Sequence, residues 1–124
     1  MKVLLVDDTK TLLSLIQVYL MGWQLEFVEA KDGIEGLAKA REHKPALVVT
    51  DVRMPGMDGF ELCAAIRADP ALHKLPVVLL TSLSDDASRK KGKLVGATAF
   101  LTKPVSVEEL RKTVGTILKL PPRR

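Results

Sequence analysis

Cysteine, aromatic residues and long apolar runs are all scarce in this sequence. The single cysteine, Cys63, excludes an internal disulfide framework and favours a reducing compartment. Aromatic residues make up 4% of the chain, which leaves few rings to stack on nucleic-acid bases. No apolar run approaches the roughly 18 residues that span a bilayer, and residues 1–8, MKVLLVDD, turn acidic too soon for a signal peptide. We therefore expect a cytoplasmic protein that neither enters a membrane nor binds nucleic acid directly.

The charge is mildly basic and unevenly spread. The 124 residues carry 19 lysines and arginines against 15 acidic residues, a formal net charge of +4. The densest basic stretch is SRKKGK at residues 88–93. Such a stretch can attract an acidic partner or can form the solvated face of a helix, and the second interpretation is favoured. With 47% apolar residues, the chain is long enough for one globular domain with its own core.

Short apolar runs alternate with amphipathic segments, which predicts strands alternating with helices. The predicted strands lie at residues 3–6, 25–30, 46–49, 77–80 and 99–101. Three of them, VLLV, ALVV and VVLL, lack polar alternation, as in strands buried on both faces, whereas the segment LEFVEA alternates in part and indicates an edge strand. Repeated β–α units predict an α/β fold, a doubly wound parallel sheet with helices on both faces.

Helix starts are marked by three capping-box patterns, at Asp32, Asp58 and Ser106, each followed three residues later by glutamate. Predicted helices include residues 59–67 and residues 84–95, the second of which contains an internal glycine. Glycine inside a helix costs about 0.5–1 kcal/mol relative to alanine, so we expect this helix to be loosely held.

Polar side chains follow the predicted strands at the ends where an open parallel sheet binds ligands. They are Asp7, Asp8, Asp51, Thr81 and Lys103. Clustered carboxylates repel one another, and Mg²⁺, which takes oxygen ligands including one or two carboxylates, would relieve that repulsion. We predict Asp8 and Asp51 as direct ligands, Asp7 as a ligand through water, and the backbone carbonyl of Arg53 as a further oxygen. An Asp-Asp pair can also be a helix N-cap or a solvated turn. This interpretation is less favoured here, because polar residues also follow the other predicted strands.

Four stretches taken together carry a family resemblance. They are VDD at residues 6–8, DVRMPGMDG at residues 51–59, TS at residues 81–82 and FLTKP at residues 100–104. In this order and spacing they resemble the response regulator receiver domain, the CheY-like phosphoacceptor family of two-component signalling. The resemblance covers residues 2 to about 119 and implies a five-stranded, flavodoxin-like sheet of order 2-1-3-4-5. We expect a receiver domain over residues 1–120 and a short tail at residues 121–124.

The resemblance implies a role for each site residue. Asp51 would accept a phosphoryl group from a histidine kinase or a histidine phosphotransfer protein, with Mg²⁺ bridging the oxygens. Lys103 would pair with the phosphoryl oxygens, and Thr81 would donate its hydroxyl to one of them. Thr81 would move toward the phosphate and Phe100 would then turn inward as a switch. The bond between Lys103 and Pro104 would be cis, as in relatives.

The resemblance also implies how the signal leaves the domain. A downstream protein would bind the face formed by the fourth helix, the fifth strand and the fifth helix. The domain would be its own weak phosphatase and not an enzyme with a separate substrate. Arg53 and Leu83, two residues beyond Asp51 and Thr81, would influence how quickly water attacks the acyl phosphate.

Three other classes were compared with the same residues. A haloacid-dehalogenase-type phosphatase needs a second aspartate two residues after the acceptor, where this chain has Arg53. A flavodoxin needs a hydroxyl- and glycine-rich phosphate loop after the first strand, where Asp7 and Asp8 would repel phosphate. A receiver-like interaction module that no longer takes phosphate should lack at least one site residue; because all are present, it remains the alternative and not the prediction.

Overall fold

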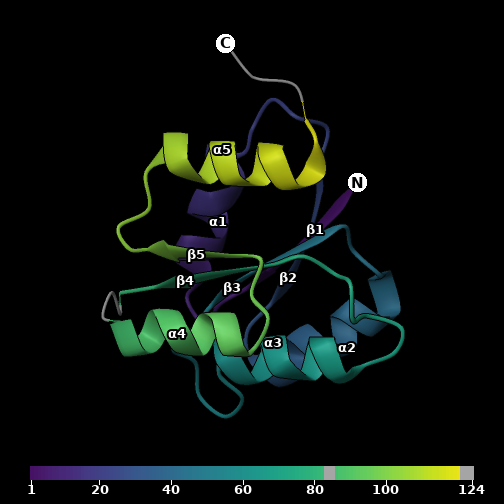
Figure 1. The fold of residues 1–124 in the computed structure, drawn as a ribbon. Helices are drawn as coiled ribbons and strands as arrows, with labels where there is room; N and C mark the ends of the chain where they lie inside the picture. The colour runs from purple at the N-terminus through teal and green to yellow at the C-terminus, as the bar shows by residue number, and fades with distance from the viewer. Residues whose placement is uncertain (83–85, 121–124) are drawn as a thin grey trace.

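Strands and helices alternate from end to end in the computed structural model, which describes residues 1–82 and 86–120 (Figure 1). The strands are β1 (Lys2–Val6), β2 (Glu26–Ala30), β3 (Leu47–Asp51), β4 (Val77–Thr81) and β5 (Ala99–Thr102). The helices are α1 (Lys10–Tyr19), α2 (Gly33–His43), α3 (Gly59–Ala68), α4 (Asp86–Leu94) and α5 (Val107–Leu118). The start that the sequence predicts for the fourth helix, Ser84, lies outside the described residues.

All five strands form one parallel sheet in the order β2-β1-β3-β4-β5. Every residue of β3 and β4 is buried, as their uninterrupted apolar runs predict. The partly alternating β2 lies at an edge, and most of its residues are only half-buried or exposed. The predicted doubly wound sheet and its strand order are therefore confirmed.

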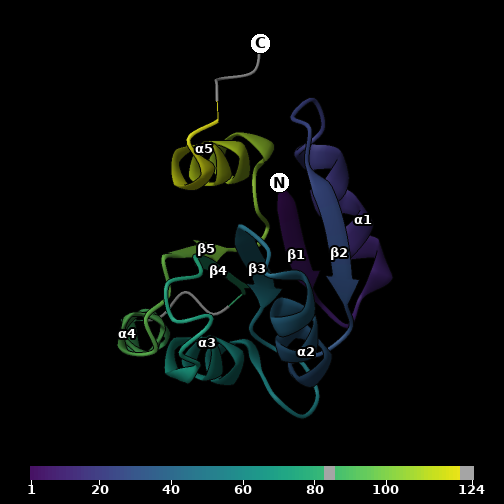
Figure 2. The ribbon, with the colours of Figure 1, turned by 90° about the vertical axis from the view of Figure 1, so that its right-hand side faces the viewer.

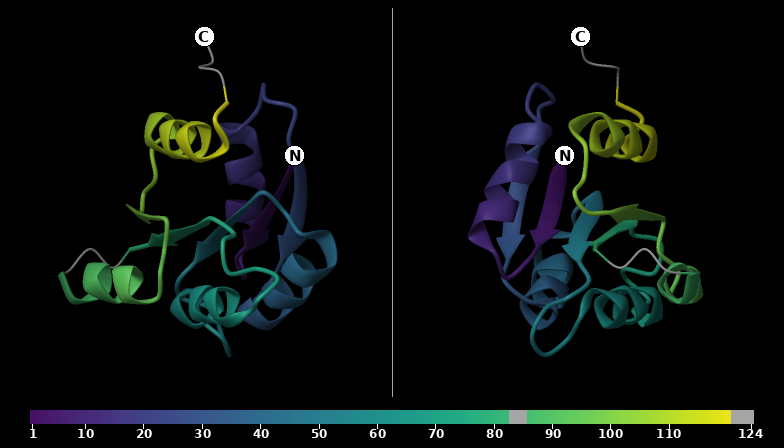
Figure 3. Two further views of the ribbon diagram at one scale, coloured as in Figure 1. Left: turned by 45° about the vertical axis from the view of Figure 1, so that its right-hand side comes forward. Right: turned by 90° about the vertical axis from the view of Figure 1, so that its left-hand side faces the viewer.

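The helices cover both faces of the sheet. Helices α1 and α5 lie on one face and α2, α3 and α4 on the other, an arrangement that the turned views in Figures 2 and 3 show from the sides. Successive residues of β1 point to opposite faces, so that Val3 and Leu5 belong to the core beneath α1 and α5, and Leu4 and Val6 to the core beneath the other helices. The sheet therefore separates two hydrophobic cores.

The predicted helix starts are built by side-chain caps. Asp58 accepts a hydrogen bond from the Glu61 N–H, and Glu61 accepts one from the Asp58 N–H, which completes a capping box for α3. Asp32 and Ser106 cap α2 and α5 by accepting from the backbone N–H three residues later. The cap at Asp58 fixes where the loop after β3 ends.

Arginine 111 joins the two helices on one face across most of the chain length. From α5, its Nη1 donates to the carbonyls of Tyr19 and Met21 at the end of α1, at 2.8 and 2.9 Å. Its guanidinium lies 4.2 Å from the centre of the Trp23 ring.

Within the described part of the chain, no helix has the combination of length and apolar character needed to cross a bilayer.

Gly59 lets α3 begin directly against the end of β3. A Cβ at this position would collide with the backbone oxygen of Asp51 and lie 2.8 Å from the Cα of Val52. We expect Gly59→Ala to lower the free energy of unfolding by about 1–3 kcal/mol, because backbone cannot move aside as a side chain can. Urea unfolding measures the change. In the control, Gly115→Ala, the new Cβ meets the Trp23 side chain at 3.3 Å and a backbone oxygen, that of Leu120, only at 4.0 Å. A loss as large as that of Gly59→Ala would contradict the explanation.

Candidate functional site

Three aspartates meet at the carboxyl edge of the sheet. The register pairs Val6 of β1 with Thr50 of β3, so the residues that follow, Asp7 and Asp51, lie side by side. One carboxylate oxygen from each of Asp7, Asp8 and Asp51 lies within 4.8 Å of the others. Asp7 and Asp51 are buried and Asp8 is exposed, so the cluster faces solvent on one side.

Lys103 supplies the positive charge of this edge. Its Nζ lies 2.9 Å from Asp51 Oδ1, which also accepts a hydrogen bond from the Val52 N–H at 3.0 Å. The backbone N–H of Lys103 donates to the carbonyl of Thr81 at 2.8 Å, and the Lys103–Pro104 peptide bond is cis. The loop after β5 is thus tied to the end of β4, with the ammonium directed at Asp51.

Asp7 is in an unfavourable environment for a charged carboxylate. Its side chain is buried, and both oxygens lack a hydrogen-bond partner within the described residues. Burial first, and then the negative charge of Asp51, raise the pKa of Asp7 to about 7, against a smaller lowering by Lys103. An ionised Asp7 therefore needs a cation, and the oxygen donors gathered here are those that a hard divalent ion such as Mg²⁺ prefers.

Thr81 and Phe100 lie on the adjoining strands. Thr81 is buried at the end of β4, one residue beyond the partner of Asp51, and pairs with Thr102 of β5. Phe100 is half-buried and packs against the core on the α4 side. A Cβ added to Gly92 would lie 3.0 Å from the Phe100 ring, so the missing side chain of this glycine lets α4 lie close against Phe100 of β5.

The comparison with family models decides what kind of site this is. A model described as the response regulator receiver domain matches residues 3–115. This chain belongs to the response regulator receiver family. Receiver domains serve two-component response regulators, generally as non-enzymatic signalling switches, and they bind Mg²⁺ at an aspartate cluster of the kind formed here.

Individual relatives agree with this assignment. The receiver is 36% identical to the protein PilG of Pseudomonas aeruginosa over 110 residues, covering 89% of this chain and 82% of PilG. It is 33% identical to PilH of the same organism, covering 94% of this chain and 97% of PilH. Among solved structures, chemotaxis protein CheY4 of Vibrio cholerae superimposes with a TM-score of 0.86 at 36% identity, covering 94% of this chain and 97% of CheY4.

Some relatives are much longer than this chain. It is 35% identical to the alkaline phosphatase synthesis transcriptional regulatory protein PhoP of Bacillus subtilis, covering 95% of this chain but 48% of PhoP. The receiver therefore corresponds to a part of such proteins and to most of others, and the similarity concerns the receiver alone.

Several contacts around the site are absent from the sequence prediction. Arg89 of α4 lies over the Phe100 ring, 5.4 Å from its centre, and Lys91 lies 4.9 Å from the centre of the Phe60 ring. Both residues stand within the basic stretch that the sequence assigns to a solvated face. The sequence around these two basic residues does not indicate the contacts, because the aromatic partners come from distant elements, β5 and α3.

Arg53 is exposed in the loop after β3 and lines an open cavity of about 680 Å³ that also includes Asp8, Asp58 and Lys91. The cavity gives solvent and small molecules access to the acidic cluster. Whether the Arg53 carbonyl binds metal stays a prediction, as do the roles of the other site residues. Leu83, predicted to tune the lifetime with Arg53, lies outside the described residues.

The raised pKa of Asp7 makes a measurable difference to stability. Without metal, the folded chain holds the Asp7 proton up to about pH 7, whereas the unfolded carboxyl releases it near 3.8. Since the unfolded state binds fewer protons in this window, the free energy of unfolding falls as pH rises through it, by on the order of 4 kcal/mol from this group. Asp7→Asn removes that contribution, so the metal-free variant should exceed the wild type in stability above the window.

Urea unfolding in EDTA at about pH 4 and about pH 8 measures the effect as the difference between wild type and Asp7→Asn, which cancels the titration of other groups. The two proteins should be similar at the lower pH and diverge at the higher one. A constant difference at both pH values would mean that Asp7 ionises as an exposed carboxyl does.

Proposed function

We propose that this receiver is a phosphoryl-accepting switch in which Asp51 takes a phosphoryl group from a histidine kinase or a histidine phosphotransfer protein. The observation that carries the proposal is the placement of Asp51, at the tip of a buried strand with Lys103 at 2.9 Å and two further carboxylates beside it. A rigid strand holds the acceptor oxygen in place, and positioning with charge neutralisation is most of what phosphoryl transfer needs.

The transfer uses the Asp51 carboxylate as nucleophile. One oxygen attacks the phosphorus of a phosphohistidine in line, the O–P bond forms as the N–P bond breaks, and the departing imidazole nitrogen takes a proton from solvent. Asp8, Asp51 and the Arg53 carbonyl would hold Mg²⁺ directly, and Asp7 through water. An ion held by these groups would supply positive charge beside the oxygens that react.

Lys103 and Thr81 respond to the new charge. A phosphoryl group brings roughly −1.5 to −2 charge and strong acceptor oxygens to Asp51. The Lys103 ammonium, paired with Asp51 in the resting state, pairs with phosphoryl oxygens instead. The Thr81 hydroxyl donates to another of these oxygens, which draws the end of β4 toward the site.

The change reaches a partner through Phe100. Its ring turns further inward as Thr81 moves, and the face formed by α4, β5 and α5 is altered. On this face Arg89 covers the ring and donates to the Thr102 hydroxyl at 3.4 Å, so the arginine moves with the switch. Shifting such an equilibrium from 1:99 to 99:1 takes about 5.5 kcal/mol of differential stabilisation, so the unphosphorylated protein retains a small active fraction. The exposed basic residues of α4 suit an acidic downstream partner.

Phosphorylation itself is tested with a small donor. Incubation with Mg²⁺ and a phosphoramidate should add the mass of one phosphoryl group, seen by intact-protein mass spectrometry, and Asp51→Asn should show no gain because it lacks the nucleophile. Asp58→Asn is the matched control, since it makes the same change at the far end of the loop that follows Asp51, and asparagine still caps α3. No gain in the wild type would favour the alternative, an interaction module that works without phosphate.

Arg53 should lengthen the life of the acyl phosphate. Its long exposed side chain stands in the cavity through which water reaches the site. We expect Arg53→Ala to hydrolyse the phosphoryl group about two- to fivefold faster, because less of the cavity is obstructed. Loss of the phosphoryl mass with time after removal of the donor gives the rate. An equal or slower rate in the variant would contradict shielding.

A further inference from the structure

A second cavity adjoins the acidic cluster on the β2 side. It has a volume of about 230 Å³, and Asp7 and Asp8 line it together with charged residues from α1, β2, the loop after β2 and α2. These charged residues are Lys10, Glu29, Lys31 and Glu35. Two of the proposed metal-site carboxylates therefore share a small space with two lysines.

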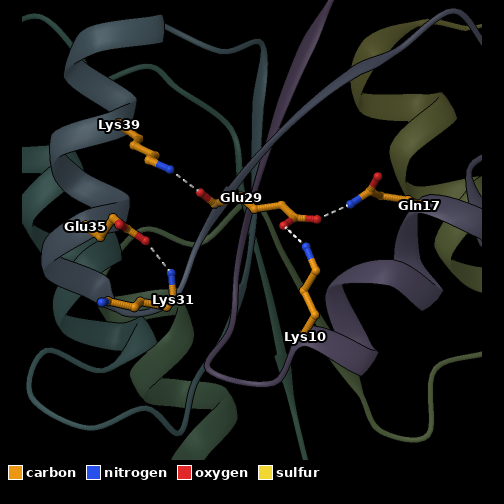
Figure 4. Close-up of polar contacts among 6 residues, drawn as sticks. All are labelled: Lys10, Gln17, Glu29, Lys31, Glu35 and Lys39. Carbon is orange, nitrogen blue, oxygen red and sulfur yellow. Dashed lines mark hydrogen bonds and ion pairs between the residues drawn. The ribbon is translucent and has the colours of Figure 1, made fainter.

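Glu29 of β2 holds one of these lysines. Its Oε1 lies 2.5 Å from Lys10 Nζ at the start of α1, and its Oε2 accepts a hydrogen bond at 2.5 Å from Gln17, two turns along the same helix (Figure 4). Its backbone carbonyl, and not its side chain, accepts from Lys39 of α2 at 2.6 Å. A change of the Glu29 carboxylate alone therefore releases Lys10 and leaves the α2 contact in place.

Lys10 is well placed to interfere with the metal site. It stands two residues after Asp8 and carries a compact charge on a flexible four-carbon stem. Its side chain is 75% exposed, so little besides Glu29 restrains it. Both oxygens of Asp7, in the same cavity, have no hydrogen-bond partner within the described residues. A released ammonium would compete with a divalent cation for the unpartnered Asp7 carboxylate, which lines the same cavity.

We propose that Glu29 is a positioning residue for the metal site, whose carboxylate keeps the Lys10 ammonium on β2 and so leaves the aspartates open to Mg²⁺. The inference rests on the proposed function in one respect, that Mg²⁺ binds at these aspartates. The Lys10–Glu29 ion pair is exposed on the Lys10 side and contributes little to folding.

A double-mutant cycle read out by Mg²⁺ affinity tests the proposal. Titration calorimetry with Mg²⁺ alone, without any phosphoryl donor, gives the dissociation constant of each variant. Glu29→Gln should weaken binding about three- to tenfold, because it frees the ammonium. Lys10→Gln should stay within about twofold of wild type, and Lys10→Gln combined with Glu29→Gln should return close to it. If only the net charge mattered, Glu29→Gln and Lys10→Gln would instead change the Mg²⁺ affinity by equal amounts in opposite directions.

Glu35→Gln is the matched control. It removes the same charge from the same cavity but releases no lysine side chain, since among the described residues the Glu35 carboxylate accepts from the backbone N–H of Lys31, and the glutamine oxygen can accept the same bond. A Glu29→Gln affinity equal to that of Glu35→Gln, or no recovery in the double variant, overturns the proposal. So does a Glu29→Gln chain that fails to fold by circular dichroism, because Glu29 would then be structural. Absence of Mg²⁺ binding in the wild type would overturn the metal site itself.

Discussion

Three carboxylates held within 4.8 Å of one another repel, and the surrounding residues of the site are arranged in response to that repulsion. Lys103 compensates one charge at 2.9 Å, and burial lets Asp7 avoid a second by keeping its proton up to about pH 7. The negative charges at this edge of the sheet are therefore never all neutralised at the same time. Adding a metal, a proton or a phosphoryl group relieves one interaction and alters the others, which is the property that a charge-operated switch requires.

Rigid strands hold the aspartates together against their repulsion. A flexible backbone would let them move apart, but Asp7 and Asp51 follow paired residues of neighbouring parallel strands, and β3 and β4 are buried throughout. Gly59 and the Asp58 capping box then return the chain into α3 immediately beyond the site. What can respond to charge is consequently confined to the loops, to α4 and to long side chains at the rim.

The sequence predicts most of the fold and the central residues of the site, but few of the contacts that long charged side chains make around them. Apolar runs and capping boxes predict the strands and helix starts because those signals are local, and strand ends predict which polar residues converge because parallel strands end at one edge. The partners of Lys10, Arg89 and Arg111 are not predictable in this way. Each reaches an element distant in the chain, such as Arg111 to Tyr19, and a charged residue on a helix has the same local pattern whether it meets solvent or a ring.

Helix α4 has a single buried residue along its length, Gly92, which lies against the Phe100 ring. Because this small residue is the one that α4 buries, the helix can tilt without opening a large void beneath it, since no large side chain has to leave the interior. The exposed side of α4 can thus change its orientation while the two hydrophobic cores stay intact. Mutational drift along the exposed side of this helix should accordingly change which proteins the receiver recognises far more readily than whether it folds.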